Sequence, residues 1–220
     1  MPPKSNLGAE RTFRRRLLAW YRRAARDLPW RRTRDPYAIV VSEFMLQQTR
    51  VARVLEYWPR FLKRYPTIRR LAGARPAAVR EAWDGLGYYR RAANLHRLAR
   101  IVVRDFDGRV PDDPAELRKL PGVGHYTAGA VACFAYERAA ATVDTNVARV
   151  LGRVFGVSGE RKLIALHAAL QRRRGRSAWT FNQAVMELGA LVCRARKPAC
   201  GVCPVSKVCR WLAVSRSAQD

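Results

Sequence analysis

Hydrophobic positions recur three and four residues apart along most of the chain, which is the spacing of one face of an α-helix. Three clear examples are the sets Phe13, Leu17, Trp20 and Tyr21; Leu95, Leu98, Ile101 and Val102; and Val147, Val150, Leu151 and Val154. Alternation of the kind found in β-strands is absent over any useful length. Proline stands where a helix could begin at Pro36, Pro76 and Pro114. The pattern predicts an all-α protein of about ten to twelve helices.

Composition excludes several classes of protein. The chain has 220 residues, of which 49% are hydrophobic, so it can bury a core and is not disordered throughout. No apolar run approaches the roughly 18–20 residues that cross a bilayer. The first 16 residues hold no apolar stretch typical of a secretory signal, so we expect a cytoplasmic protein. The net charge of +26 indicates an anionic partner, although codon bias toward arginine explains part of it, and nucleic acid fits better than a membrane surface.

Four of the five cysteines lie close together near the end of the sequence. Cys193, Cys200, Cys203 and Cys209 follow the spacing C-x6-C-x2-C-x5-C, whereas Cys133 sits in an apolar run and is predicted to be a buried small residue. Thiols stay reduced in the cytosol, so the four indicate a metal centre rather than disulfides. Only one pair has the tight spacing that zinc prefers. The spacing therefore favours an iron–sulfur cluster over zinc and leaves both open.

A glycine-containing break separates two helical patterns within residues 117–132, LRKLPGVGHYTAGAVA. Gly122 and Gly124 allow close approach of the backbone to a ligand, and the following helix start presents N–H groups and a positive dipole end. This combination predicts a phosphate-binding hairpin that cannot read base sequence. The alternative is an ordinary tight turn between two helices.

Two carboxylates stand in unusual surroundings. Glu43 lies within the apolar run IVVSEFML, where loss of hydration would raise its pKa and make it a proton donor near neutral pH. Asp144 precedes a long amphipathic pattern and is also suited to cap that helix. Together they resemble the acid and the stabilising carboxylate of glycoside hydrolysis. No histidine stands in a catalytic-triad or zinc-ligand pattern.

Seven motifs then give the chain a family resemblance that runs from Leu28 to Leu212. They are LPWR at 28–31, SEFMLQQTRV at 42–51, GLGYYRRAANLH at 85–96, LPGVGHYTAGA at 120–130, VDTNVARV at 143–150, FNQAVMELGALVC at 181–193 and the four-cysteine tail. The chain resembles the helix–hairpin–helix DNA glycosylases of the endonuclease III and MutY superfamily. The resemblance implies a two-lobed fold with a six-helix domain over residues 29–140. Residues 1–28 and 141–220 would form a second domain, whose four cysteines hold a [4Fe–4S] cluster.

The resemblance also assigns roles to single residues. Glu43 matches the acid that protonates adenine, Asp144 the catalytic aspartate, and Asn146 a residue that positions the catalytic groups and water. Tyr126 stands where strand-cleaving members carry a lysine, so lyase activity is not expected. The DNA-binding residues implied are Gln47, Gln48, Tyr88, Tyr89, Gly122, Val123, Gly124 and His125.

The function implied is a monofunctional base-excision-repair glycosylase acting on double-stranded DNA. The MLQQT and GLGYYRRAANLH stretches favour removal of adenine opposite guanine or 8-oxoguanine. The DFDGRVP and VGHYT stretches resemble the mismatch thymine/uracil glycosylases, which remain the alternative. The chain ends about 11 residues after Cys209, so we expect no C-terminal 8-oxoguanine-recognition domain.

Two further alternatives are a non-catalytic iron–sulfur DNA-binding module and a zinc-bound nucleic-acid adaptor. We expect a cytoplasmic, nucleoid-associated monomer.

Overall fold

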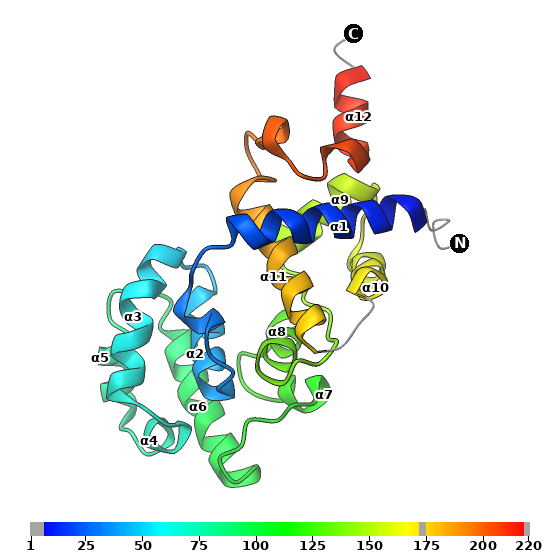
Figure 1. Cartoon of the computed structure of the whole chain (residues 1–220). Coiled ribbons are helices and arrows are strands. Elements are labelled where there is room, and N and C mark those ends of the chain that lie inside the picture. The colour runs from blue at the N-terminus through cyan, green and yellow to red at the C-terminus, as the bar shows by residue number, and fades with distance from the viewer. Residues whose placement is uncertain (1–6, 172–174, 218–220) are drawn as a thin grey trace. The chain divides into compact units, whose positions relative to one another are not determined.

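A computed structural model describes residues 7–171 and 175–217. Within these ranges the chain forms α-helices and short 3₁₀ helices and no strand, which confirms the all-α prediction (Figure 1). The chain divides into two compact units. One comprises residues 27–136, and the other joins the N-terminal segment up to residue 26 to the residues from 137 onward.

The unit of residues 27–136 is a set of helices packed around the buried pair α2 and α8. Its elements are the 3₁₀ helix η1 (Pro29–Arg31), α2 (Pro36–Leu46), α3 (Val51–Arg64), α4 (Ile68–Ala72), α5 (Pro76–Ala82), α6 (Arg90–Asp105), α7 (Pro114–Leu117) and α8 (His125–Tyr136). Helix α2 packs against α3, α6 and α8, while α4 and α5 pack against α6.

Local sequence explains where these helices start. Pro36, Pro76 and Pro114 occupy the first turn of α2, α5 and α7, as predicted. Proline is favoured there because its missing N–H would have no partner within the helix. The carboxylates of Asp35 and Asp113 accept hydrogen bonds from backbone N–H groups two residues on, which caps α2 and α7.

Helices α2 and α8 are buried on nearly all sides. Every residue of α2 from Tyr37 to Met45 is buried, and so is every residue of α8 from Thr127 to Phe134. Cys133 is fully buried on α8, as its apolar surroundings predict. Helices that are apolar all round occupy the centre of a core. A polar residue on either helix is therefore held in place by packing on every side.

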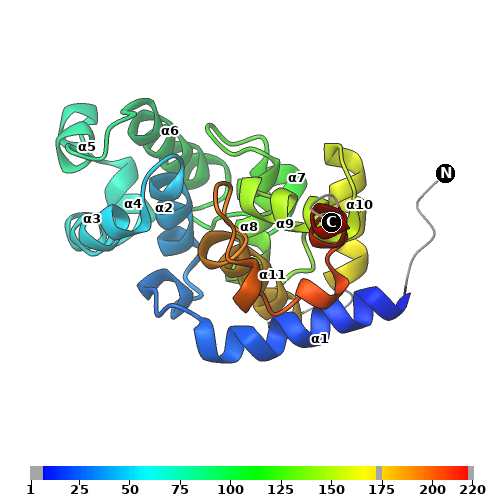
Figure 2. The same ribbon diagram turned by 90° about the horizontal axis from the view of Figure 1, so that it is seen from above.

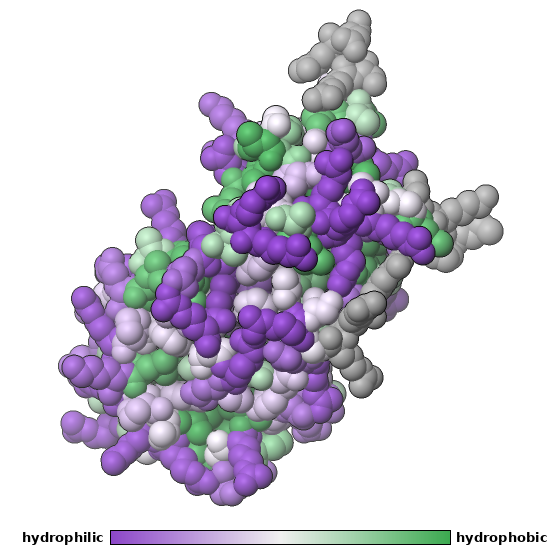
Figure 3. All heavy atoms as spheres, viewed as in Figure 1, coloured by the Kyte–Doolittle hydropathy of each residue, from purple (hydrophilic) through white to green (hydrophobic). Residues whose placement is uncertain are grey.

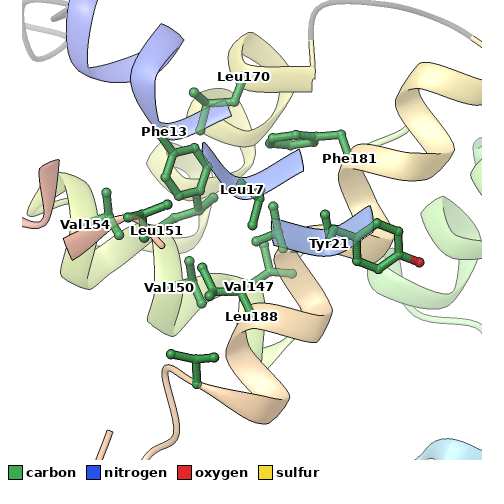
Figure 4. Packing of buried hydrophobic residues seen from close by; sticks show 14 of the residues in the cluster. Phe13, Leu17, Tyr21, Val147, Val150, Leu151, Val154, Leu170, Phe181 and Leu188 are labelled. Carbon is green, nitrogen blue, oxygen red and sulfur yellow. The ribbon is translucent and has the colours of Figure 1, made fainter. Parts of the chain in front are cut away.

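The second unit is built around one hydrophobic cluster. Its elements are α1 (Leu7–Ala24), α9 (Thr145–Phe155), α10 (Glu160–Gln171), α11 (Arg176–Leu191), the 3₁₀ helices η2 (Cys200–Val202) and η3 (Ser206–Val208), and α12 (Arg210–Ser217). Helix α1 lies beside α11, although the two are far apart in sequence (Figures 1 and 2). Phe13 and Leu17 of α1 meet Val150 of α9 and Leu188 of α11 in the cluster (Figure 4).

A partly buried ion pair adds a polar link between the N-terminal segment and α11. Arg26 follows α1, and its Nε lies 2.8 Å from Oε1 of the fully buried Glu187. The backbone N–H of Arg26 donates to the same oxygen, and Nη2 donates to Oε2. This forked contact raises the pKa of Arg26. A buried carboxylate is tolerated here because both of its oxygens are hydrogen-bonded.

A chain in which 27% of the residues are charged should have a hydrophilic surface. Hydrophilic side chains cover much of the visible face of each unit (Figure 3). Among the described residues, no helix is both long and apolar enough to cross a membrane.

His167 makes the second unit sensitive to acid. Its imidazole is fully buried beside Phe181, and desolvation lowers its pKa to about 4, against a smaller opposing effect of Asn182. The pKa of His167 in the folded protein lies below its unfolded value of about 6.5. Protonation of His167 therefore leaves the free energy of unfolding unchanged above pH 6.5 and lowers it as the pH drops toward 4. We expect protonation of His167 to lower the free energy of unfolding by about 2 kcal/mol between pH 7 and pH 5. Urea unfolding at both pH values should show this loss for the wild type and not for His167→Gln.

Candidate functional site

Glu43 occupies the central helix of its unit. It lies near the end of α2, and only 4% of the residue is exposed. Tyr126 is the second residue of α8, the helix packed against α2, and is partly exposed. A carboxylate on a rigid helix inside a core cannot swing into solvent, so its direction is fixed by the fold. Such placement suits a proton donor that must meet one atom of a substrate.

The hairpin between α7 and α8 packs tightly on α2. Gly122 has a φ of +79°, and a Cβ there would lie 2.8 Å from the Phe44 ring and 3.0 Å from the Asn94 side chain. Only glycine fits this position, for both reasons. The N–H of Val123 donates to the Leu120 carbonyl, and its side chain is buried, so this residue anchors the turn. Gly124 and His125 are exposed at the start of α8, where helix N–H groups lack intrahelical acceptors.

Gln47, Gln48, Tyr88 and Tyr89 line one surface hollow together with residues of α6. Tyr88 is 62% exposed and Tyr89 is 37% exposed, so neither belongs to the core. Gln48 and Tyr88 have positive φ angles of 55° and 46°, which non-glycine residues rarely adopt. Gln47 donates from Nε2 to the Gly122 carbonyl at 3.5 Å, which brings this surface next to the hairpin.

Arg91 links the loop that follows α2, which carries Gln47 and Gln48, to the loop that precedes α6, which carries Tyr88 and Tyr89. This largely buried side chain donates from Nη1 to the carbonyls of Phe44 and Met45 at the end of α2, and to that of Gln47. Its Nη2 donates to the carbonyls of Leu86 and Gly87, 3.1 Å away in each case. Desolvation lowers the pKa of Arg91. The residue thus satisfies the last carbonyls of α2 and fixes the loops that carry the glutamines and tyrosines.

Replacing Arg91 is expected to damage both stability and DNA binding. Arg91→Met leaves several buried carbonyls without a donor, at about 1–3 kcal/mol each before relaxation, so we expect a loss of about 3 kcal/mol or more. Thermal unfolding and affinity for a mismatched duplex measure the two effects. Arg90→Met removes the neighbouring exposed cation and should keep normal stability. Equal unfolding temperatures for the two variants would contradict this role of Arg91.

Asp144 caps helix α9 in the other unit, as its sequence context predicts. Its Oδ1 accepts from the Val147 N–H at 2.7 Å, and its Oδ2 accepts from Asn146 Nδ2 at 3.1 Å. The two hydrogen bonds fix the orientation of a partly exposed carboxylate. Helix N-terminal N–H groups also favour a negative charge at this position.

The contact network continues from Asn146 to the cysteine loop. Arg149 donates from Nη2 to Asn146 Oδ1 at 2.6 Å and to the Gly189 carbonyl at 2.8 Å. Its Nε donates to the Cys193 carbonyl at 2.7 Å. A Cβ on Gly189 would lie 2.7 Å from Asn146 Cβ, so the approach of α11 to α9 requires glycine. Asp144 is thereby connected, through two side chains, to the backbone of the first tail cysteine.

All four tail cysteines line one small cavity with apolar walls. Desolvation and the three neighbouring sulfurs raise the pKa of Cys203 to about 11, and desolvation also raises that of Cys209. Among the described residues, no three or more His, Cys, Asp or Glu side chains gather as they would around a single ion. Four thiols around one cavity are the ligand set that an iron–sulfur cluster uses, and its positive irons would favour the thiolate form.

The two carboxylates belong to different units. Within residues 27–136, the structure gathers Gln47, Gln48, Tyr88 and Tyr89 into one hollow and places the hairpin beside Gln47. Within the second unit it brings Asp144 and Asn146 into contact and groups the four cysteines. The sequence does not predict the roles of Arg91 and Arg149, because most of their partners are backbone carbonyls remote along the chain.

Comparison with known proteins identifies the family. Residues 41–173 match the HhH-GPD superfamily of base excision DNA repair proteins, and residues 193–209 match the iron–sulfur binding domain of endonuclease III. The adenine DNA glycosylase of Mycobacterium tuberculosis is 48% identical over 219 residues, covering 96% of this chain and 71% of that protein. The human adenine DNA glycosylase is 43% identical over 212 residues, covering 90% of this chain and 39% of that protein.

Two solved structures of DNA glycosylases have the same fold as this chain. A thermostable thymine-DNA glycosylase superposes with a TM-score of 0.89 at 33% identity, covering 94% of this chain and 98% of that one. A non-covalent endonuclease III–DNA complex gives a TM-score of 0.80 at 24% identity, covering 94% and 96%, which shows the shared fold. The tail is therefore an iron–sulfur cluster-binding segment. The chain belongs to the HhH-GPD superfamily of base excision DNA repair proteins and is a DNA glycosylase.

Proposed function

We propose that this glycosylase removes adenine mispaired with guanine or 8-oxoguanine and leaves an abasic site. The observation that carries the proposal is the 48% identity to an adenine DNA glycosylase along 96% of the chain, together with a buried Glu43 and a capped Asp144. The similarity to the thymine-DNA glycosylase is lower, at 33% identity, so adenine is the favoured base.

Hydrolysis of the glycosidic bond would divide two tasks between the carboxylates. A base inside a duplex cannot be reached, so the nucleotide must first be flipped out, which costs a few kcal/mol and less at a mismatch. Glu43 then protonates the purine ring, which makes the base a better leaving group. Asp144 is held in place and stabilises the positive charge that develops on the sugar. Water completes the displacement, and Asn146 positions the aspartate.

Tyr126 supports a monofunctional reaction. Strand-cleaving glycosylases form a Schiff base through an amine, and a phenol cannot form one. The product of this chain is then an intact strand with an abasic site, cut only after alkali treatment.

The DNA contacts of the proposal use backbone and aromatic groups. Gly124 and His125 at the start of α8 bind phosphate, while Gln47, Gln48, Tyr88 and Tyr89 approach the mismatch. Nearby hollows along α6 are lined by Arg97 and Arg100, which add positive charge beside this surface. The enzyme acts as a monomer at genomic DNA. When bound, the iron–sulfur cluster ties the four tail cysteines together.

A panel of duplexes tests the substrate. Purified protein is incubated with duplexes carrying A:8-oxoguanine, A:G, T:G and U:G, and abasic sites are revealed with alkali. The proposal predicts adenine release from the first two and little release from the others. Release of thymine or uracil alone would move the chain to the mismatch thymine/uracil class, and no release from any duplex would contradict the glycosylase assignment.

A further inference from the structure

Arg153 lies against the cysteine cavity and touches its first ligand. The residue sits on α9, and its Nη1 lies 3.5 Å from the Sγ of Cys193. The same nitrogen donates to the Arg194 carbonyl at 2.8 Å, and Nη2 donates to the Ala195 carbonyl at 3.1 Å. One guanidinium thus contacts the Cys193 sulfur and the carbonyls of the next two residues.

The main chain of Arg153 reaches the last cysteine. The Sγ of Cys209 lies 3.7 Å from the Arg153 carbonyl oxygen. The guanidinium also covers the ring of Trp211, with its central carbon 4.9 Å from the ring centroid. Both ends of the four-cysteine segment therefore contact this single residue of α9, and Trp211 shields one side of the side chain from water.

The charge of Arg153 is not balanced by a carboxylate. In the part of the chain that the structure describes, this side chain forms no ion pair, whereas other arginines of the protein, such as Arg26 and Arg64, are paired with glutamates. Its neighbours are carbonyls, an aromatic ring and thiols. A partly buried cation in such a place needs a negative partner, and a cluster bound by four thiolates carries net negative charge.

We propose that Arg153 is a positioning residue of the iron–sulfur centre, whose cationic side chain raises the reduction potential of the cluster and holds the ligand loop by its carbonyls. Reduction adds one electron and one more negative charge to the cluster, so a cation beside a ligand sulfur stabilises the reduced form more than the oxidised form. The proposal concerns the cluster alone and does not depend on which base the enzyme removes.

Substitutions of Arg153 can separate the effect of its charge on the potential from its hold on the ligand loop. Lysine keeps the positive charge but lacks the planar fork that reaches two carbonyls and a sulfur at once. Glutamine keeps a hydrogen-bond donor without the charge, and methionine removes both. If the charge sets the potential, the arginine and lysine proteins should share one potential, and the glutamine and methionine variants should share a more negative one. If the planar fork holds the ligand loop, the arginine protein should retain the cluster longest.

The test measures the cluster and not the repair reaction. Four proteins are purified with the cluster bound: the wild type, Arg153→Lys, Arg153→Gln and Arg153→Met. The midpoint potential of each cluster is measured by spectroelectrochemistry, from its absorbance near 400 nm. We expect the two neutral variants to shift to more negative potential, by a tenfold change in the one-electron equilibrium, about 59 mV. Arg153→Lys should stay near the wild type in potential but lose iron faster in air.

Arg194→Met is the matched control. It removes a cation from the same loop, but that side chain is exposed and donates to the Lys197 carbonyl, with no contact to a cysteine. Its potential should equal that of the wild type. Unchanged potentials in both neutral variants, or an equal shift in Arg194→Met, would overturn the charge role. If Arg153→Met does not hold iron, the comparison of Arg153→Gln with Arg153→Lys decides the same question.

Discussion

Asp144→Asn is expected to lower the single-turnover rate of adenine release by roughly 1,000-fold or more, while the protein stays folded and binds DNA. Loss of a fixed charge that faces a developing cation has effects of this size. Asparagine caps helices as well as aspartate, so α9 should keep its cap to Val147. Rapid-quench measurement of base release and a thermal melt check the two halves of this expectation.

Asp113→Asn provides the matched control for that variant. Asp113 also caps a helix through its side chain, in this case α7, by accepting from the Ala115 N–H. The same chemical change there should leave base release within a factor of about two. A folded Asp144→Asn enzyme that releases base as fast as Asp113→Asn would contradict the catalytic role. Unfolding of Asp144→Asn would contradict the expectation that asparagine keeps the cap of α9.

Glu43→Gln is expected to give the second largest loss. The amide is close in shape to the carboxyl group and fits the same packed position on α2, but it cannot deliver a proton to the base. Removal of a positioned general acid lowers rates by about 100- to 10,000-fold. Single-turnover base release from an A:G duplex measures this change, with binding determined separately by titration.

Glu56→Gln separates this effect from a general loss of negative charge. Glu56 lies on α3 in the same unit, where its exposed side chain pairs with Arg53. Normal release by Glu56→Gln together with strongly reduced release by Glu43→Gln supports the assignment. Wild-type rates in Glu43→Gln would require another proton donor.

The helices and their caps could be predicted from sequence because they depend on neighbouring residues. Proline at residues 36, 76 and 114 starts helices, and Asp144 caps one, through contacts within a few positions. The need for glycine at position 122 follows from the same local reasoning, although its contact with Phe44 does not. Residue roles at the site came from motif resemblance, which names positions without giving their partners.

Contacts made through remote backbone could not be predicted in this way. Arg91 binds the carbonyls of residues 44, 45, 47, 86 and 87, and Arg149 joins Asn146 to the Cys193 carbonyl. A carbonyl group is present at every residue, so the sequence carries no sign of which ones an arginine will meet. With 43 lysines and arginines in the chain, the few buried ones cannot be told from the many that form the charged surface.

The central claim is that Glu43 and Asp144 act on one extruded nucleoside. The most direct measurement is a crystal structure of the protein bound to a duplex in which the mispaired adenosine carries a 2′-fluorine, which blocks cleavage. We predict the Glu43 carboxyl group within about 2.6–3.2 Å of a purine nitrogen, directly or through one water, and the Asp144 carboxylate facing the sugar carbon that bears the base. A flipped adenine that contacts neither carboxylate would contradict the account.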